Sequence, residues 1–399
     1  MPPKIDPEVG CEIPEPGNWP VDPQEDVTIA EDRLWIDGCF DFFHHGHAGV
    51  MLQSRRLGTS LVVGLHSDEA ILANKGPTVM SLKERVLAVE ACRFSSKCVP
   101  HAPYVTSLPW ISHYGCKYVT HGDDITSDAS GEDCYRFVKK AGRMKIVPRT
   151  PGISTTDLVG RMLLCTKEHF IRSLVDTLRG REGAGGEGEK VERGQRMADR
   201  ISEYAAAPDG VDSGIQIYSL NGDSSFMPMD YPPAFVIAGI HSDEVINHHK
   251  GLNYPIMNIF ERGLCVVQCR YVHQVVFGAP YAPTKAYLES LPAVQSSPSH
   301  LRLPDAVYHG PTSYMPSTSS EDPYADAKAS EIFVETPEHE FQDVNAAQIV
   351  QRILDRRGEY EERQRKKGVK GVGEGALRRR EMEDEAVRER ERREGKNGA

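Results

Sequence analysis

The sequence predicts an α/β protein made of two tandem domains, each with a parallel β-sheet and covering helices. Three observations support this fold class. Short apolar segments alternate with helix-forming segments from residue 33 onwards, polar motifs directly follow the apolar segments, and part of the first half recurs in the second half. Such alternation is typical of βαβ units, in which crossover helices join parallel strands. The 399 residues are sufficient for two ordinary domains.

The elements expected in the first domain follow one another regularly. The expected strands are 34–36, 61–65, a short one at Val99, 118–119 and 145–147. The expected helices are 45–56, 81–92, one that Thr106 caps, 133–141, and one that Ser154 caps. Ser81-Leu82-Lys83-Glu84 has the form of a capping box. Because the carboxyl ends of parallel strands meet at one edge of a sheet, we expect the motifs that follow them to form one site.

The most informative segment is 38–47, which reads Gly-Cys-Phe-Asp-Phe-Phe-His-His-Gly-His and follows the first apolar run. His44 and His47 are three residues apart, so they share one face of a helix that begins here. The first turn of a helix has unpaired N–H donors and favours negative charge. The segment therefore predicts an anion site, and the alternative is two surface histidines on a helix.

Three further polar motifs follow in order. They are Lys75-Gly76, His121-Gly122-Asp123-Asp124, and Arg149-Thr150-Pro151-Gly152-Ile153-Ser154-Thr155-Thr156. Together with 38–47 they resemble the motifs of the cytidylyltransferase family, a branch of the nucleotidylyltransferases that carry a His-x-Gly-His signature. The resemblance is strong over 30–170 and partial over 235–365. It implies two tandem Rossmann-like nucleotidylyltransferase domains.

The resemblance also implies a reaction in which a phosphate oxygen attacks the α-phosphorus of CTP, without a covalent enzyme intermediate. His44 and His47 would donate to the α-phosphate, Lys75 would bridge it to the incoming phosphate, and Arg149 would hold the β- and γ-phosphates. The implied CTP-binding residues are Gly38, Cys39, Phe40, His44, His47, Lys75, His121, Gly122, Asp123, Asp124, Arg149, Ile153, Ser154, Thr155 and Thr156. For 121–124, an Asx turn after a strand is an equally weighted alternative.

Asp37 and Tyr104 match positions that resemble the amino-alcohol pocket of the family, where a carboxylate and an aromatic face would hold an ammonium group. For Tyr104, a structural role as an aromatic residue of the core is an equally weighted alternative. A tandem repeat without a membrane-inserting helix resembles the members that use phosphoethanolamine in phosphatidylethanolamine synthesis. The alternatives are another acceptor, phosphocholine or glycerol 3-phosphate, and a nucleotide-binding regulatory pseudoenzyme. Mg²⁺ is implied as an ion carried by the CTP phosphates, with no dedicated protein metal site.

The second half repeats the first with losses. Residues 63–69, Val-Gly-Leu-His-Ser-Asp-Glu, return at 238–244 as Ala-Gly-Ile-His-Ser-Asp-Glu, and Lys75-Gly76 returns as Lys250-Gly251. The second copy has no histidine between Gly222 and Gly239, and alignment places Glu340 opposite Arg149 and Asn345 opposite Ser154. We therefore predict that the second domain is degenerate and does not turn over CTP. A shortened gene product would give the same sequence.

Composition and charge set the remaining expectations. The expected parts are a flexible arm (1–30), a catalytic domain (31–172), a Gly- and charge-rich linker (173–214), the second domain (215–358) and a charged tail (359–399). The net charge of −11 argues against nucleic-acid binding. Nine scattered cysteines without a Cys-x-x-Cys pair indicate free thiols, and no transmembrane segment or signal peptide is expected, so we predict a cytoplasmic protein. The sequence is compatible with a homodimer.

Overall fold

The computed structural model describes residues 7, 28–124, 126–207, 214–219, 235–295, 303–310, 322–363 and 365. Most of the predicted flexible arm and most of the charged tail lie outside the described residues. The chain divides into two compact units, 1–156 together with 353–399, and 157–352. This division differs from the predicted domain boundaries in three ways. Residues 157–172 belong to the second unit, the predicted linker 173–214 also belongs to it, and the segment from 353 belongs to the first unit.

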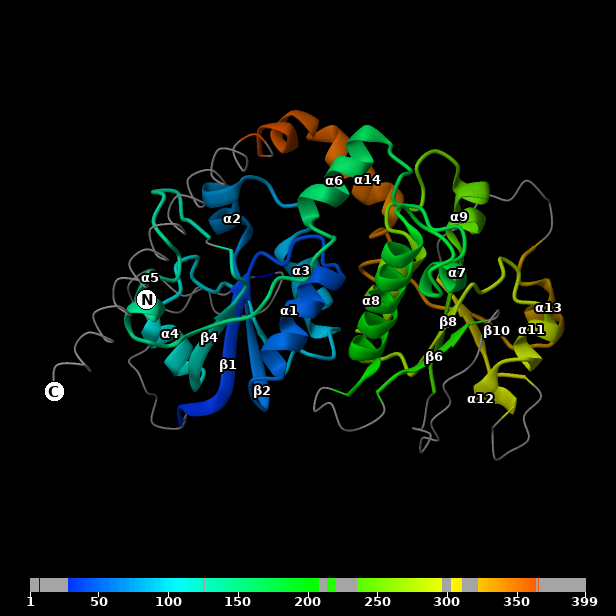
Figure 1. Ribbon diagram of the computed structural model, residues 1–399, viewed down its shortest axis with the longest axis horizontal. Coiled ribbons are helices and arrows are strands. Elements are labelled where there is room, and N and C mark those ends of the chain that lie inside the picture. Colours follow the sequence, from blue (N-terminus) through cyan, green and yellow to red (C-terminus); the bar gives the residue numbers. More distant parts are fainter. Residues whose placement is uncertain are drawn as a thin grey trace. The chain divides into compact units, whose positions relative to one another are not determined.

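The first unit contains a five-stranded parallel sheet in the order β3-β2-β1-β4-β5. The strands are β1 (Ala30–Gly38), β2 (Ser60–Leu65), β3 (Lys97–Val99), β4 (Cys116–His121) and β5 (Met144–Ile146). Figure 1 shows β1 between β2 and β4. The chain adds strands on one side of β1 and then crosses to its other side. The carboxyl ends of β1 and β4 therefore border the switch point, where open α/β sheets bind ligands.

The sheet is predicted by its apolar runs because both of its faces are buried. Leu34, Trp35 and Ile36 of β1 are at most 2% exposed. A strand covered by helices on both faces reads as a continuous apolar run rather than an alternating one. Gly64 on β2 makes room for the indole ring, since a Cβ there would lie 2.3 Å from Cζ2 of Trp35.

The helices of the first unit largely match the predicted ones. They are α1 (His45–Arg55), α2 (Asp68–Lys75), α3 (Leu82–Glu90), α4 (Leu108–His113), α5 (Arg136–Lys140) and the start of α6 (Thr155–Leu164). The predicted capping box of α3 is confirmed, because Ser81 and Glu84 each accept the other's backbone N–H. Helix α2 was not expected from the sequence. The prediction that Thr106 caps α4 is wrong, because Ser107 holds that position and the buried Thr106 hydroxyl donates to Asp37.

Within its described residues, the second unit has a smaller and divided sheet, which agrees with the prediction of a second, degenerate repeat. A three-stranded parallel sheet has the order β6-β8-β7, and β9 and β10 form a separate parallel pair. Its strands are β6 (Gln216–Ser219), β7 (Ile237–Ile240), β8 (Gln274–Phe277), β9 (Val307–His309) and β10 (Phe333–Glu335). Its helices are α7 (Leu174–Leu178), α8 (Glu187–Ala205), α9 (Asp243–Lys250), α10 (Ile259–Val267), α11 (Lys285–Glu289), α12 (Pro292–Gln295) and α13 (Ala325–Ala329), and α14 (Ala346–Asp355) begins there.

The contacts of the two repeats confirm that they are copies. Arg85 donates to the His66 carbonyl and to Asp68, and Arg262 donates in the same way to the His241 carbonyl and Asp243. Asn345 caps α14 by accepting two backbone N–H groups, so it precedes α14 as Ser154 precedes α6. The alignment that places Asn345 opposite Ser154 therefore holds in the fold.

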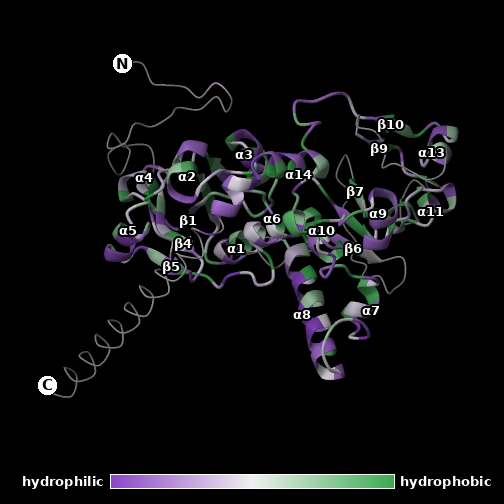
Figure 2. Ribbon diagram, turned by 90° about the horizontal axis from the view of Figure 1, so that it is seen from above, coloured by the Kyte–Doolittle hydropathy of each residue, from purple (hydrophilic) through white to green (hydrophobic). Residues whose placement is uncertain are grey.

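The interpretation of 173–214 as a linker is wrong for most of its described part. It contains α7 and the 19-residue α8, which packs against α7 and α10. Hydrophilic residues predominate along α8 (Figure 2), but Met197, Ile201 and Tyr204 are buried on one face at helical spacing. Gly194 allows the close approach of α7, since a Cβ there would lie 2.5 Å from the Leu178 carbonyl oxygen. No helix in the described part of the chain is long and apolar enough to cross a membrane.

Candidate active site

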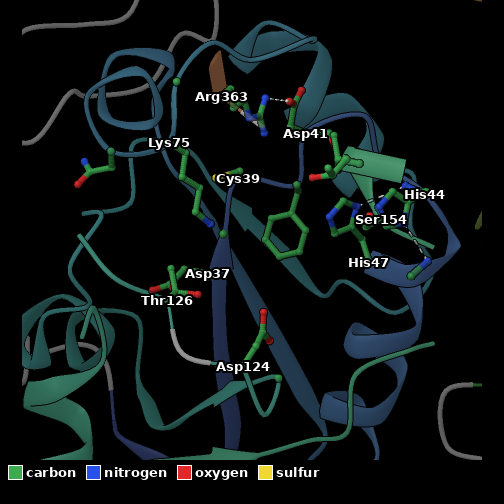
Figure 3. Close-up of a pocket in the computed structure, with 18 of the residues that line it drawn as sticks. Asp37, Cys39, Asp41, His44, His47, Lys75, Asp124, Thr126, Ser154 and Arg363 are labelled. Atoms are coloured by element: carbon green, nitrogen blue, oxygen red, sulfur yellow. Dashed lines mark hydrogen bonds and ion pairs between the residues drawn. The ribbon is translucent and has the colours of Figure 1, made fainter. Parts of the chain in front are cut away.

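The four sequence motifs of the first unit meet at one pocket of about 570 Å³. Figure 3 shows His44 and His47 on one side of it and Lys75 on the other. Its walls come from the end of β1, the first turns of α1, the end of α2, the segment after β4, the segment leading into α6, and 359–363. The expected site residues that line it are Asp37, Gly38, Cys39, Phe40, His44, His47, Lys75, His121, Gly122, Asp124, Arg149, Ile153, Ser154, Thr155 and Thr156.

The backbone at the start of α1 sets the tautomer of both histidines. Nδ1 of His44 accepts the Gly46 N–H at 3.1 Å, and Nδ1 of His47 accepts the His44 N–H at 3.4 Å. A neutral imidazole whose Nδ1 accepts must carry its proton on Nε2. The two rings stack at 4.0 Å, and the buried Nε2 of His44 has no hydrogen-bond partner among the described residues. Both rings are therefore prepared to donate from Nε2.

Burial keeps this pair neutral. Loss of solvation, with the nearby Arg149, lowers the pKa of His44 to about 3. Loss of solvation and the neighbouring His44, Lys75 and Arg149 also lower the pKa of His47 well below its ordinary value. At physiological pH the pair is a set of neutral N–H donors and not a pair of cations.

The lowered pKa of His44 predicts that acid destabilises the folded protein. Below the ordinary His pKa of 6.5 the unfolded chain binds a proton at this site and the folded chain does not, so stability is lost as the pH falls from about 6.5 towards 3. Between pH 7 and pH 5 this one group should cost about 2 kcal/mol of unfolding free energy. His44→Gln should remove that part of the loss. Denaturant unfolding at both pH values measures it, and equal losses in the two proteins would contradict the assignment.

Contacts between motifs hold the histidines in place. A Cβ on Gly46 would lie 2.8 Å from the His44 ring and 2.9 Å from Ile153, so only glycine fits between α1 and the segment before α6. The Thr155 hydroxyl donates to the Asp41 carbonyl at 2.9 Å. The amino ends of α1 and α6 thus face the same pocket, and each supplies the unpaired N–H groups that bind anions.

Asp41 connects the histidine motif to the segment after Lys75, and sequence reasoning did not single it out. Its buried carboxylate accepts the Val79 and Met80 N–H groups, both at 3.0 Å. The flanking Phe40 and Phe42 have positive φ of 46° and 51°, which is unfavourable for bulky side chains. The bonds of Asp41 help to offset this strain. The Asp inside the motif was the available signal, but its partners are 38 and 39 residues away.

Arg149 is the adjustable cation of the pocket. It lies 3.8 Å from Asp124, and both side chains are 52% exposed. An exposed ion pair at this distance contributes little to stability. Arg149 can therefore exchange Asp124 for an incoming phosphate at small cost.

Arg149→Lys should weaken the use of CTP while leaving folding intact, because lysine keeps the charge but lacks the planar fork that binds two phosphate oxygens. We expect KM for CTP to rise by about tenfold, which corresponds to the loss of one charge-assisted hydrogen bond. Steady-state kinetics with CTP as the varied substrate measures this. Unchanged kinetics would mean that Arg149 does not contact CTP.

The segment expected to contact the nucleoside reaches the pocket only in part. His121, Gly122 and Asp124 line it, whereas Asp123 is exposed and does not. The His121 ring lies 4.5 Å from the Tyr135 ring, and burial lowers the pKa of His121. Thr126 and Ser127 also line the pocket. Sequence reasoning missed both because they lie beyond the motif.

Of the two residues expected to bind the amino-alcohol, Asp37 lines the pocket and Tyr104 does not. The buried Asp37 carboxylate accepts from the indole of Trp35 at 2.8 Å and from the hydroxyls of Thr106 and Tyr135 at 2.7 Å. The Tyr104 ring instead packs beside the hydrophobic core of this unit. Besides Trp35, Tyr135 is an aromatic residue that contacts Asp37 directly, and nothing in the sequence around Tyr135 indicated this contact.

Comparisons with known proteins agree with this geometry. The family model described as cytidylyltransferase-like matches residues 35–161. Mouse ethanolamine-phosphate cytidylyltransferase is 37% identical over 374 residues, which cover 85% of this chain and 89% of that protein. The Saccharomyces cerevisiae ethanolamine-phosphate cytidylyltransferase is 52% identical over 298 residues, covering 65% of this chain and 84% of its own. Rat choline-phosphate cytidylyltransferase A is 38% identical over 133 residues, covering 33% of this chain and 36% of its own.

Proposed function

Because the chain belongs to the ethanolamine-phosphate cytidylyltransferase family, we propose that it transfers the cytidylyl group of CTP to phosphoethanolamine, giving CDP-ethanolamine and pyrophosphate. The single observation that carries the proposal is the opposition of the neutral His44–His47 pair and Lys75 across one pocket at the switch point of the sheet. Such a pocket offers donors and a cation to charge that develops on a phosphorus centre between them.

The reaction needs no nucleophile from the protein. A phosphate oxygen of phosphoethanolamine forms the new bond to the α-phosphorus, and the bond from that phosphorus to the β-phosphate bridging oxygen breaks, so pyrophosphate leaves with the electron pair. The histidine Nε2–H groups donate to the α-phosphate oxygens, where each donor is worth ~3–4 kcal/mol in a transition state. Lys75 holds the two reacting phosphates together against their repulsion.

Mg²⁺ is proposed as part of the CTP substrate. No group of three or more His, Cys, Asp or Glu residues in the described ranges is arranged to hold a metal ion. Two of the carboxylates that line the pocket already accept from protein donors, Asp37 from three side chains and Asp41 from backbone N–H groups. This donor set suits a magnesium ion that is ligated by phosphate oxygens and water.

The acceptor is assigned to phosphoethanolamine on the chemistry of Asp37. A primary ammonium group needs hydrogen-bond acceptors as well as opposite charge, whereas a trimethylammonium group needs only an aromatic cage and charge. The Asp37 carboxylate lines the pocket, and its three protein donors leave about one of its four acceptor positions for an ammonium group. Tyr104 adds no aromatic face to the pocket.

The decisive experiment gives the purified full chain CTP and Mg²⁺ with phosphoethanolamine, phosphocholine or glycerol 3-phosphate, and measures pyrophosphate release. We expect kcat/KM for phosphoethanolamine to exceed that for phosphocholine by about tenfold or more, since a lost charge-assisted contact is worth this much. Comparable values would contradict the acceptor assignment. No pyrophosphate with any acceptor would favour the regulatory pseudoenzyme.

A further inference from the structure

A short helical segment after α14 forms one wall of the catalytic pocket. We call residues 357–363 the C-terminal strap. It belongs to the first unit although more than 190 residues of the second unit precede it in the chain. Glu359, Glu362 and Arg363 line the pocket, and Tyr360 is 2% exposed. Figure 3 shows Arg363 next to Asp41, above Lys75.

The strap binds the backbone that follows Lys75. The Tyr360 hydroxyl donates to the Thr78 carbonyl at 2.8 Å. Nη1 of Arg363 donates to the Pro77 carbonyl at 2.5 Å and lies 3.3 Å from Oδ2 of Asp41. Burial, with the neighbouring Asp41, raises the pKa of Tyr360 to about 12, so its donor proton is retained at physiological pH.

Arg363 also completes the environment of Asp41. That carboxylate is 2% exposed, and a buried charge is costly unless it is paired. Arg363 supplies the opposite charge, while Val79 and Met80 supply backbone N–H groups. The strap, Asp41 and segment 76–80 therefore form one hydrogen-bonded unit that begins one residue after Lys75.

The packing at Gly76 shows that the two segments fit each other. Gly76 has φ of 96°, and a Cβ built there would lie 3.3 to 3.6 Å from Cβ, Cγ and Cδ of Arg363. The aliphatic part of the Arg363 side chain thus packs against the backbone directly after Lys75, where α2 ends. At the equivalent Gly251 of the second repeat, the described residues place no atom within 4 Å of such a Cβ. The strap contact is a property of the catalytic repeat.

We propose that Arg363 and Tyr360 are positioning residues, which hold segment 76–80 against Asp41 and thereby place Lys75 for phosphoryl contact. The proposal rests on the proposed function, in which Lys75 bridges the two reacting phosphates. An ammonium group on a four-carbon stem loses its effect when its backbone anchor moves by about 1 Å. The position of Lys75 thus depends on a segment that follows it by about 280 residues in the sequence.

The test uses full-length Arg363→Ala and Tyr360→Phe, with Arg357→Ala as the matched control. Arg357 is in the same strap but pairs with exposed Glu361 away from the pocket. Hydrogen exchange of the Val79 and Met80 amides reports the hold on the segment and needs no substrate. Loss of a charge-assisted bond should speed this exchange by about tenfold or more and lower kcat/KM for phosphoethanolamine by about 10- to 100-fold. KM for CTP should change by less than about threefold, because the CTP contacts proposed for Arg149 and the amino end of α6 are not among the hydrogen bonds that Tyr360 and Arg363 make to segment 76–80 and Asp41.

Each other result overturns the proposal. Lost activity with unchanged exchange would make Arg363 a direct substrate ligand, and faster exchange with unchanged activity would make the strap merely structural. If Arg363→Ala fails to fold, Tyr360→Phe decides, because it removes one hydroxyl and keeps the ring. If the wild-type chain releases no pyrophosphate, the proposed function fails. The exchange measurement still tests the strap separately, because unchanged exchange in the variants would show that the strap does not hold segment 76–80.

Discussion

Lys75→Ala should abolish cytidylyl transfer, whereas Lys250→Ala should leave it nearly intact. Lys75 faces the stacked histidine pair across the pocket, where its charge offsets the repulsion between the incoming phosphate and the α-phosphate. The neighbouring cation Arg363 is already paired with the buried Asp41. We expect a loss of about 10³-fold or more in kcat/KM, comparable to the removal of a principal transition-state contact.

Lys250 has the same place in the repeat but different surroundings. Its Nζ lies 5.7 Å above the Tyr254 ring, and the aligned position of Arg149 is occupied by Glu340, which would repel a triphosphate. The two variants should be compared side by side for pyrophosphate release and for thermal unfolding. Equal losses of activity would show that the second repeat contributes to the chemistry, while a large fall in Tm for Lys75→Ala would make its kinetics uninformative and call for Lys75→Gln.

The sequence predicts those parts of the structure that depend on residues close together in the chain. The run 34–36 predicts a strand because a doubly covered strand needs no alternation, and β1 indeed continues from it to Gly38. The His44–His47 spacing predicts a helix start because three residues are nearly one turn, and α1 begins at His45. Both patterns lie within about ten residues, so they can be read without knowing the fold.

Contacts between distant segments could not be predicted. Asp41 with Val79, Tyr135 with Asp37, and the C-terminal strap with Thr78 each join residues far apart in the chain. No periodicity marks such partners, because each depends on which strand ends the topology brings together. The error over α8 has another cause. Its charge and glycine content resembled a linker, although Met197, Ile201 and Tyr204 recur at helical spacing within 173–214.

His47→Ala should lower kcat by about 10²–10³-fold with little change in the affinity for CTP. Nδ1 of His47 accepts the His44 N–H, so its Nε2–H is committed to the pocket as a neutral donor, and burial keeps it neutral. A neutral donor gains most where negative charge grows, which happens on the α-phosphate oxygens as the new bond forms. In the proposed function, Arg149 and the amino end of α6 would hold the ground-state triphosphate, and the substitution leaves both in place.

His47→Gln is the informative companion, because its amide N–H can reach the position of Nε2 and should restore part of the loss. His248→Ala, which removes an imidazole from α9 of the second repeat, is the control and should be silent. Single-turnover kinetics with saturating CTP separates the chemical step from binding. If His47→Ala retained near-normal kcat, or if Gln were no better than Ala, donation from Nε2 would not be the role of His47. A rise in KM for CTP at constant kcat would instead assign this histidine to ground-state binding.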